Sequence, residues 1–478
     1  MSFKRCIILL ADGSKHDVLS ELIAQGQLPN INKELLAEGS IRRAVTVFPS
    51  TTGPAHIPYL TGCLPATCNV PGIRWFDKKL YHNFGHGSVL SFGSHGRYRS
   101  YVGVETFRIN SDMRNDIYNV FEILPRSYSI FNSINRGVGK RNLTKIMRMW
   151  YWYYGHLTDR WKFVDGCGFK KAMKVAKKDI DFLFAVLPGI DEYSHMNHPK
   201  HGSTIEQYKF FDNCVGELIG QLKADNKWDD TLFFIVSDHG LSATHTHFCV
   251  NTFLEDRGIK TFYFPLIYRK DCAAASMVSG NGMTHIYFRK EEGWSGHATI
   301  EDINSMYPGL LKELLAEPAV DVIAMRDREN NIVVWTKRGR AKVKMEGDRI
   351  SYFVKEQDPF GYPFDAARTT LHSSREMLSS TIDSDYPDAP YQLAHIFTSP
   401  RCGDLVVSAT PGYDLRVKYE NPEHRSSHGS LHKEHMIVPV ISNIKLPDVP
   451  MRTVDIFPTY LKLMGYEAPE NIDGINLN

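Results

Sequence analysis

The stretch CIILLADG, residues 6–13, places a short apolar run directly before an aspartate and a glycine. Such a run is typical of a strand that is buried on both faces of a parallel sheet. Similar apolar runs occur at residues 182–187, 232–236 and 436–441. Patterns with helical periodicity lie between or after them, at residues 18–25, 31–38, 204–223, 300–315 and 454–464. This alternation predicts an α/β fold in which helices flank a mostly parallel central sheet.

The length and composition limit the classes of protein that fit. The chain has 478 residues, enough for one large domain with insertions or for two or three smaller domains. Its net charge of +2 gives no reason to expect a nucleic-acid partner. No segment approaches the roughly 18 apolar residues that a spanning helix needs, and the first apolar run is too short for an export signal. We therefore expect no transmembrane segment and a cytoplasmic location, while the oligomeric state stays open.

Two segments depart from the strand–helix alternation. Residues 78–165 are rich in Gly, Ser, Tyr and Arg, and residues 318–400 contain alternating segments typical of hairpins. We predict that the first segment is an inserted cap and the second an insertion with hairpins. Residues 1–77, 166–317 and 401–478 then form the core.

The sequence MRMWYWYYGHLTDRW, residues 147–161, lies within the first predicted insertion. Trp, Tyr and Arg are enriched where proteins meet membranes, so a lipid-facing helix is one interpretation. A buried cap helix is the other interpretation, and we favour it. The lipid-facing alternative keeps an amphiphilic substrate with a lipid head group open.

A cluster of hydroxyl groups lies in FPSTTGPAH, residues 48–56. A strand-like run over residues 44–48 precedes Ser50, Thr51 and Thr52, and a helix is expected after them. A hydroxyl group at such a junction lies next to the free amides of a helix N-terminus, which favour a bound phosphate. The cluster therefore indicates a nucleophile that attacks phosphorus.

Acidic and imidazole side chains follow several of the predicted strands. They occur in ADG, in LPGIDEYSH, in SDHG and in RSSHGS, and they are Asp12, Asp191, His195, Asp238, His239 and His428. A single aspartate at a strand end is often only a helix cap, and an Asp-x-x-x-His pair can be a surface contact. Their joint occurrence at strand ends, where α/β sheets carry their sites, indicates bound Zn²⁺ or a similar divalent ion.

Together these motifs resemble a known family. FPSTTGPAHIPYLTGCLP, residues 48–65, with ADG, DEYSH, SDHG and SHGS in this order, resembles the alkaline phosphatase superfamily. The likeness is to its nucleotide pyrophosphatase/phosphodiesterase-like branch, the type I phosphodiesterases. The resemblance implies an alkaline-phosphatase-like core with inserted cap segments. It covers approximately residues 1–77, 180–250, 280–290 and 425–465.

The resemblance also implies two divalent metal ions, most simply Zn²⁺, with Mn²⁺ or Fe as alternatives. The implied ligands of the first ion are Asp191, His195 and His428. The implied ligands of the second ion are Asp12, Thr52, Asp238 and His239. Two ions about 4 Å apart would bracket the reacting phosphoryl group.

The motif implies Thr52 as the nucleophile in preference to Thr51 and Ser50. Pro54 suits a first helical turn, which places Thr52 just before the helix, and Gly53 has no side chain to block an approaching phosphate. A threonine hydroxyl needs activation by a metal ion or a base near neutral pH. The expected mechanism is in-line attack by Thr52, followed by hydrolysis of a phosphothreonine.

The match is incomplete in NVPGIRWFDKK, residues 69–79, where many relatives carry an asparagine that holds a phosphoryl oxygen. Arg74 could bind two phosphate oxygens instead, or it could pair with Asp77. We predict a phosphodiesterase or pyrophosphatase acting on a small phosphoester, either nucleotide-like or a lipid head group. The alternatives are a phosphomonoesterase or phosphonate hydrolase on the same metals, and a non-catalytic binding protein that retains the fold.

Overall fold

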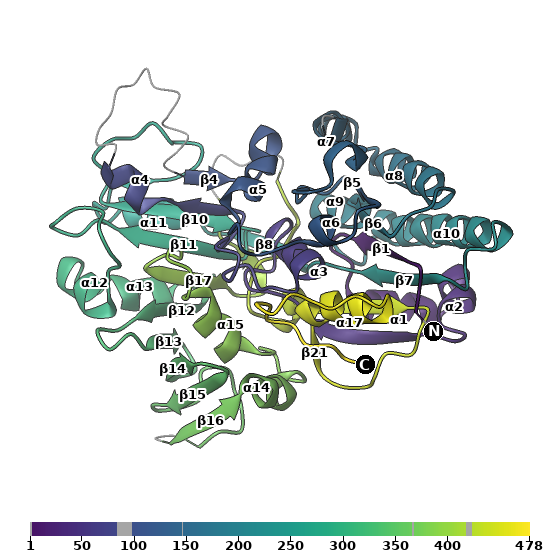
Figure 1. The fold of residues 1–478 in the computed structure, drawn as a ribbon. Coiled ribbons are helices and arrows are strands. Elements are labelled where there is room, and N and C mark those ends of the chain that lie inside the picture. Colours follow the sequence, from purple (N-terminus) through teal and green to yellow (C-terminus); the bar gives the residue numbers. More distant parts are fainter. Residues whose placement is uncertain (1, 84–97, 146, 366–367, 417–422) are drawn as a thin grey trace.

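The computed structural model describes residues 2–83, 98–145, 147–365, 368–416 and 423–478 (Figure 1). Residues 84–97 of the first predicted insertion therefore lie outside the described residues. The described strands form two large sheets, one of seven strands and one of nine, together with two small sheets.

The central sheet has seven strands in the order β21-β2-β20-β7-β1-β6-β5. Their bounds are β1 (Arg5–Ala11), β2 (Ser40–Val45), β5 (Ser127–Ile130), β6 (Phe182–Leu187), β7 (Thr231–Val236), β20 (Ile437–Ser442) and β21 (Met451–Arg452). Strand β1 runs parallel to β6 and β7, and β5 runs parallel to β6, whereas β20 is antiparallel to β7 and β2. The predicted mostly parallel sheet is confirmed.

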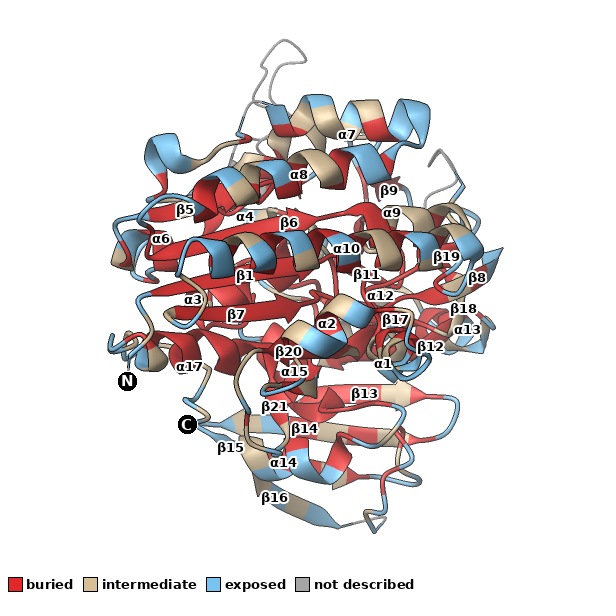
Figure 2. Cartoon of the chain, turned by 90° about the vertical axis from the view of Figure 1, so that its right-hand side faces the viewer, coloured by how far each residue is buried: buried red, intermediate tan, exposed pale blue. Residues whose placement is uncertain are grey.

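The middle of this sheet is apolar because helices cover both of its faces. Every residue of β1, β6 and β7 is buried (Figure 2). On one face Phe182 stacks on Tyr460 of α17 (Ile456–Leu463), with ring centroids 5.4 Å apart. The side chain of Leu187, which points to the other face, packs close to Gly168 of α8 (Trp161–Ala176). Helix α10 (Gly202–Ala224) packs on α8 on that second face.

The register of the central strands sets the position of the polar residues that follow them. Ala11 at the end of β1 pairs with Leu187 at the end of β6, and Leu10 pairs with Val236 at the end of β7. The three carboxyl ends are therefore level at one edge of the sheet. Side chains that come directly after these strands must gather there.

The second sheet has nine strands in the order β16-β15-β14-β13-β12-β17-β11-β10-β9. Their bounds are β9 (Thr261–Phe262), β10 (Ala274–Ser279), β11 (Met283–Phe288), β12 (Val320–Arg326), β13 (Ile332–Thr336), β14 (Arg340–Glu346), β15 (Arg349–Val354), β16 (Thr369–Ser373) and β17 (Leu405–Ala409). Strands β12 to β16 pair antiparallel in sequence order and belong to the second predicted insertion. They extend a sheet that also contains β10, β11 and β17, and the predicted division into core and insertions stays a prediction.

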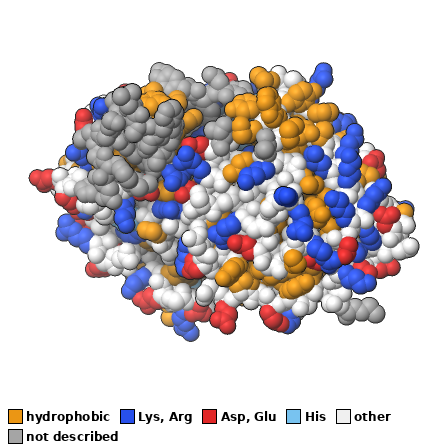
Figure 3. All heavy atoms as spheres, turned by 45° about the horizontal axis from the view of Figure 1, so that its top comes forward, with side chains coloured by type: hydrophobic (Ala, Val, Ile, Leu, Met, Phe, Trp, Pro, Cys, Tyr) orange, Lys and Arg blue, Asp and Glu red, His pale blue; other side chains and the backbone are white. Residues whose placement is uncertain are grey.

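Helix α7 (Met147–Thr158) has two contrasting faces. Arg148 is buried, whereas Trp150, Tyr153 and Leu157 are 69%, 54% and 82% exposed. The interpretation as a buried cap helix therefore holds for one face only, and Figure 3 shows apolar side chains gathered where α7 lies. Among the described residues, no helix combines the length and apolar composition needed to cross a bilayer.

Candidate active site

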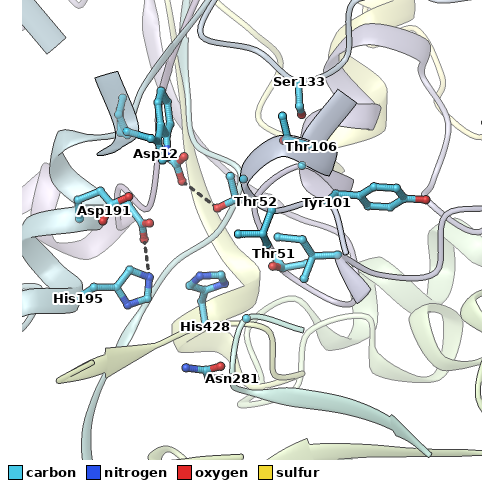
Figure 4. Close-up of a pocket in the computed structure, with 18 of the residues that line it drawn as sticks. Asp12, Thr51, Thr52, Tyr101, Thr106, Ser133, Asp191, His195, Asn281 and His428 are labelled. Carbon is cyan, nitrogen blue, oxygen red and sulfur yellow. Dashed lines mark hydrogen bonds and ion pairs between the residues drawn. The ribbon is translucent and has the colours of Figure 1, made fainter. Parts of the chain in front are cut away.

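A cavity lined by both polar and apolar side chains opens at the carboxyl edge of the central sheet (Figure 4). It has a volume of about 220 Å³, and its walls include Asp12, Thr52, Asp191, His195 and His428. These residues come from segments far apart in the sequence. Asp238 and His239 lie behind this wall, completely buried, directly after β7. The structure therefore brings all the predicted metal ligands together, while their role as ligands stays a prediction.

The Asp191–His195 pair lies on α9 (Gly189–Met196), which begins almost directly after β6. A spacing of four residues places both side chains on one face of the helix, with His195 Nε2 3.4 Å from Asp191 Oδ1. His195 Nδ1 lies 2.8 Å from the carbonyl oxygen of Ser426. A carbonyl can only accept, so Nδ1 donates and Nε2 keeps its lone pair for a metal ion.

His428 follows β19 (Ser426–Ser427) and is oriented in the same way. Its Nδ1 lies 3.0 Å from the carbonyl oxygen of Ser50, which leaves Nε2 available. One ligand atom each from Asp191, His195 and His428 lies within 4.8 Å of the others. This set is the one that the resemblance implies for the first ion.

The second predicted set surrounds the Thr52 hydroxyl. Thr52 Oγ1 lies 3.0 Å from His239 Nε2 and 3.4 Å from Asp12 Oδ1. His239 Nε2 lies 3.5 Å from carboxylate oxygens of both Asp12 and Asp238. The hydroxyl and both carboxylates thus lie within 3.5 Å of His239 Nε2, and the groupings close enough for one ion are Asp12 with Asp191 and His239, and Asp12 with His56 and Asp238.

The electrostatics of these groups fit a bound cation. Burial, together with the negative charges of Asp238 and Asp191, raises the pKa of Asp12 well above its usual value. Burial alone would also raise the pKa of Asp238, but His239 and His56 lower it below its usual value. Asp191 Oδ1 is buried and accepts no hydrogen bond from any described residue. Divalent cations compensate such crowded carboxylates, and the mixture of carboxylate and imidazole donors suits Zn²⁺.

The backbone around Thr52 separates it from its neighbouring hydroxyls. Ser50 and Thr51 are completely buried, whereas Thr52 is partly exposed to the cavity. Gly53 has φ +91°, which favours glycine, and it also lines the cavity. The predicted helix after it is short, because a 3₁₀ turn (Pro54–His56) leads into α3 (Ile57–Thr61). The geometry favours Thr52 as the nucleophile, and the substrate-binding role of Gly53 stays a prediction.

His56 was not among the predicted ligands, yet it contacts one of them. Its Nε2 lies 3.2 Å from Asp238 Oδ2, and its ring packs edge-on against Phe184. We interpret His56 as a residue that orients the Asp238 carboxylate. The sequence contained a signal for this contact. His56 comes four residues after Thr52, and one helical turn over that distance brings both side chains to the same strand ends.

Arg74 lies on β3 (Arg74–Phe76) and lines the cavity. Its Nε donates to Ser100 Oγ at 3.2 Å, and its guanidinium group lies 5.1 Å from the centre of the Phe264 ring. Both the phosphate-binding role and the pairing with Asp77 stay predictions. Arg148 and Glu192 also line this cavity and were not among the predicted site residues.

Gly13 offers a test of how closely the Asp191 carboxylate must be held. It has φ +67°, and a Cβ atom there would lie 2.7 Å from Asp191 Oδ1. We expect Gly13→Ala to displace Asp191 and to weaken Zn²⁺ binding by about tenfold to a hundredfold, measured by competition with a chelating dye. Gly26→Ala is the matched control, because Gly26 has φ +69° with nothing within 4 Å of the added atom. Equal affinities of the two variants would show that the contact with Asp191 is unimportant.

Comparison with known proteins gives a family. The family model described as type I phosphodiesterase / nucleotide pyrophosphatase matches residues 6–431. The chain belongs to this family. The predicted family and the predicted enzyme class, a phosphoester hydrolase, are therefore confirmed. No curated protein matches the chain.

Solved structures share the fold of this phosphodiesterase-family chain. Phosphonoacetate hydrolase from Sinorhizobium meliloti 1021, in complex with phosphonoformate, is 16% identical with a TM-score of 0.57. The match covers 97% of this chain and 95% of that chain. An inactive form of murine ectonucleotide pyrophosphatase/phosphodiesterase 5, in complex with AMP, is 13% identical with a TM-score of 0.57. That match covers 98% of this chain and 97% of that chain, and the likeness confirms the predicted fold class.

Proposed function

We propose that this phosphodiesterase-family chain hydrolyses a phosphodiester or pyrophosphate bond in a small molecule, through a phosphothreonine on Thr52 and with two divalent metal ions. The observation that carries the proposal is the position of the Thr52 hydroxyl. It contacts Asp12 and His239 on one side and reaches the cavity on the other. Ser50 lies outside the cavity wall, and Thr51, although it lines the cavity, is completely buried and its hydroxyl makes no hydrogen bond to a described residue.

The donor sets assign the residues that would hold the ions. Asp191, His195 and His428 would hold one ion, and Asp12, Asp238, His239 and Thr52 the other. Bound divalent ions lower the pKa of a hydroxyl nucleophile and offset the negative charge of the phosphoryl group. Zn²⁺ fits the carboxylate and imidazole donors, with Mn²⁺ or Fe as alternatives.

The residues of the chain supply positioning. His239 Nδ1 lies 3.2 Å from the carbonyl oxygen of Gly240, so its Nε2 lone pair faces the Thr52 hydroxyl. Thr52 Oγ1 forms the new bond to phosphorus while the bond to the leaving oxygen breaks. Water then cleaves the phosphothreonine and regenerates the hydroxyl. Phosphoryl transfer depends mainly on such positioning and on charge stabilisation.

The cavity also supports a second candidate, a phosphonate or phosphomonoester hydrolase on the same donor set. Arg74 lines the cavity and would favour a more highly charged phosphoryl group. The structural likeness to phosphonoacetate hydrolase supports this alternative, whereas the family model supports a diester or pyrophosphate substrate and the AMP-bound murine structure a nucleotide-like one. A non-catalytic binding protein has no support, because every predicted donor and the nucleophile are present.

A panel of esters, assayed with controlled metal content, tests the proposal. We expect bis-p-nitrophenyl phosphate to be hydrolysed faster than p-nitrophenyl phosphate or phosphonoacetate. We also expect a chelator to abolish turnover, and Zn²⁺ or Mn²⁺ to restore it after the chelator is removed. Faster monoester or phosphonate hydrolysis would favour the second candidate. Full activity in protein shown by metal analysis to contain no metal would contradict both.

A further inference from the structure

Arg148 is a buried cation in the wall of the cavity. It lies in the first turn of α7, is 9% exposed, and lines the same space as Asp12 and Thr52. Its Nε donates to the carbonyl oxygen of Phe131 at 3.0 Å, and its Nη1 donates to Thr106 Oγ1 at 3.4 Å. Its Nη2 makes no hydrogen bond to any residue that the structure describes. Part of the guanidinium group is therefore available to a ligand in the cavity.

No described carboxylate forms an ion pair with this arginine, although Asp12 and Glu192 attract it at longer range and its guanidinium carbon lies 4.1 Å from the centre of the Trp152 ring. A buried cation without a paired anion is costly, and burial lowers the pKa of Arg148 to about 10. Arg452 shows the usual arrangement in this chain, since its buried guanidinium binds both oxygens of Asp388. The contrast indicates that Arg148 can form a close ion pair with an anionic ligand in the cavity, which Asp12 and Glu192 do not form with it.

Two hydroxyl groups accompany Arg148 in the cavity wall. Thr106 contacts the guanidinium group directly, and Ser133 lines the same cavity. Figure 4 shows Thr106 and Ser133 near each other, on the side of Thr52 that faces away from Asp191 and His195. The cavity therefore has a metal-binding end and a second end with a cation and hydroxyl donors. Donors of this kind bind carboxylate and phosphate oxygens.

We propose that Arg148, with Thr106 and Ser133, forms a subsite for a second anionic group of the substrate. That group is a carboxylate or a phosphate, and it is separate from the phosphoryl group that reacts at Thr52. The inference rests on the proposed function and narrows it to substrates that carry two anionic groups. The guanidinium group discriminates against esters with a neutral second end, because they leave its charge buried and unpaired.

Calorimetry on the metal-loaded protein tests the subsite with three ligands. Methylphosphonate has one anionic group, phosphonoacetate adds a carboxylate, and methylenediphosphonate adds a second phosphonate. We expect the wild-type protein to bind at least one of the two larger ligands about tenfold or more tightly than methylphosphonate, as charge-assisted hydrogen bonds allow. The preferred larger ligand shows which anion the subsite takes.

The variants separate this subsite from general binding. We expect Arg148→Met to lose the preference for the larger ligand. The ratio of the dissociation constant for methylphosphonate to that for the preferred larger ligand then falls to near one, and Arg148→Lys should keep part of the preference. Arg160→Met is the matched control, because Arg160 is exposed and outside the cavity wall, and the ratio should stay at its wild-type value. Circular dichroism reports whether each variant is folded. If Arg148→Met fails to fold, Thr106→Val takes its place and should reduce the ratio.

The outcomes also separate this inference from the proposed function. A wild-type ratio near one, or an unchanged ratio in folded Arg148→Met, would overturn the subsite even if every ester is hydrolysed. A wild-type protein that shows the expected ratio but hydrolyses neither the nitrophenyl esters nor a phosphoester that carries a second anionic group would overturn the proposed function and leave the subsite supported.

Discussion

Thr52→Ala is expected to lower kcat/KM for an ester substrate by at least about a thousandfold, because removing a covalent nucleophile removes the reaction path itself. The Thr52 hydroxyl contacts Asp12 and His239 and reaches the cavity. An alanine methyl group would keep the backbone turn at Gly53 but could not bond to phosphorus. The measurement is a rate comparison on protein with verified metal content, so that loss of an ion is not mistaken for loss of the nucleophile.

Two further variants sharpen this test. Thr52→Ser keeps a hydroxyl and should retain measurable turnover, with a phosphorylated peptide detectable by mass spectrometry after acid quenching. Thr51→Ala removes a hydroxyl group that is buried and has no hydrogen-bond partner among the described residues. We expect it to cost far less activity than Thr52→Ala. The reverse order of activities would move the nucleophile to Thr51.

Arg452→Met is expected to have the largest effect on stability, a loss of about 3 to 5 kcal/mol in the free energy of unfolding. Arg452 is 2% exposed, and its Nε and Nη2 each lie 2.7 Å from an oxygen of Asp388. Removing the guanidinium group leaves the Asp388 carboxylate completely buried without its counter-charge. Chemical denaturation followed by circular dichroism measures the loss.

A double variant tests whether the isolated charge causes this loss. Asp388 has φ +62°, a conformation that asparagine tolerates better than other residues, so Asp388→Asn is the suitable second change. We expect the combination with Arg452→Met to recover part of the lost stability, since Gln392 can still donate to position 388. If the free energy of unfolding of Arg452→Met lies within about 1 kcal/mol of the wild-type value, the ion pair is unimportant for stability. The pair joins the predicted core to the second predicted insertion, so the result also tests whether the two unfold together.

The central strands could be predicted because apolar residues fill them, apart from Arg5 and Thr231 at the starts of β1 and β7. The runs at 6–11, 182–187 and 232–236 correspond closely to β1, β6 and β7. Whether a strand pairs parallel or antiparallel was harder to predict. The run at 436–441 has the composition of a buried parallel strand, yet β20 is antiparallel to both of its neighbours. Backbone pairing direction depends on the path of the chain between strands, which an apolar run does not encode.

Helix boundaries were predictable where periodicity is unbroken. The pattern at 204–223 matches α10 (Gly202–Ala224), whereas that at 300–315 is two helices, α12 (Ile300–Met306) and α13 (Leu310–Ala316). The break contains Pro308 and Gly309, and Gly309 has φ +88°. A proline–glycine pair is a recognised helix breaker, so the sequence held this signal.

The side chains that sequence analysis missed depend on distant contacts. Arg148 is defined by its bonds to Phe131 and Thr106 and by the cavity beside it. Arg148 stands between two methionines and is followed by a run of aromatic residues at 150–154, so no apolar periodicity separates the buried face of α7 from the exposed one. The predicted metal donors were accessible because each lies close to a strand end or in a family motif.

The level strand ends have a consequence for how the protein matures. The second donor set is complete once residue 239 has been made, whereas the first set also needs His428, from a segment near residue 430. Capture of the first ion would therefore be linked to docking of this late segment against the ends of the central strands, and each bound ion would stabilise the folded state by mass action. Affinity for the first ion in such an arrangement reports whether the late segment has closed onto the central sheet.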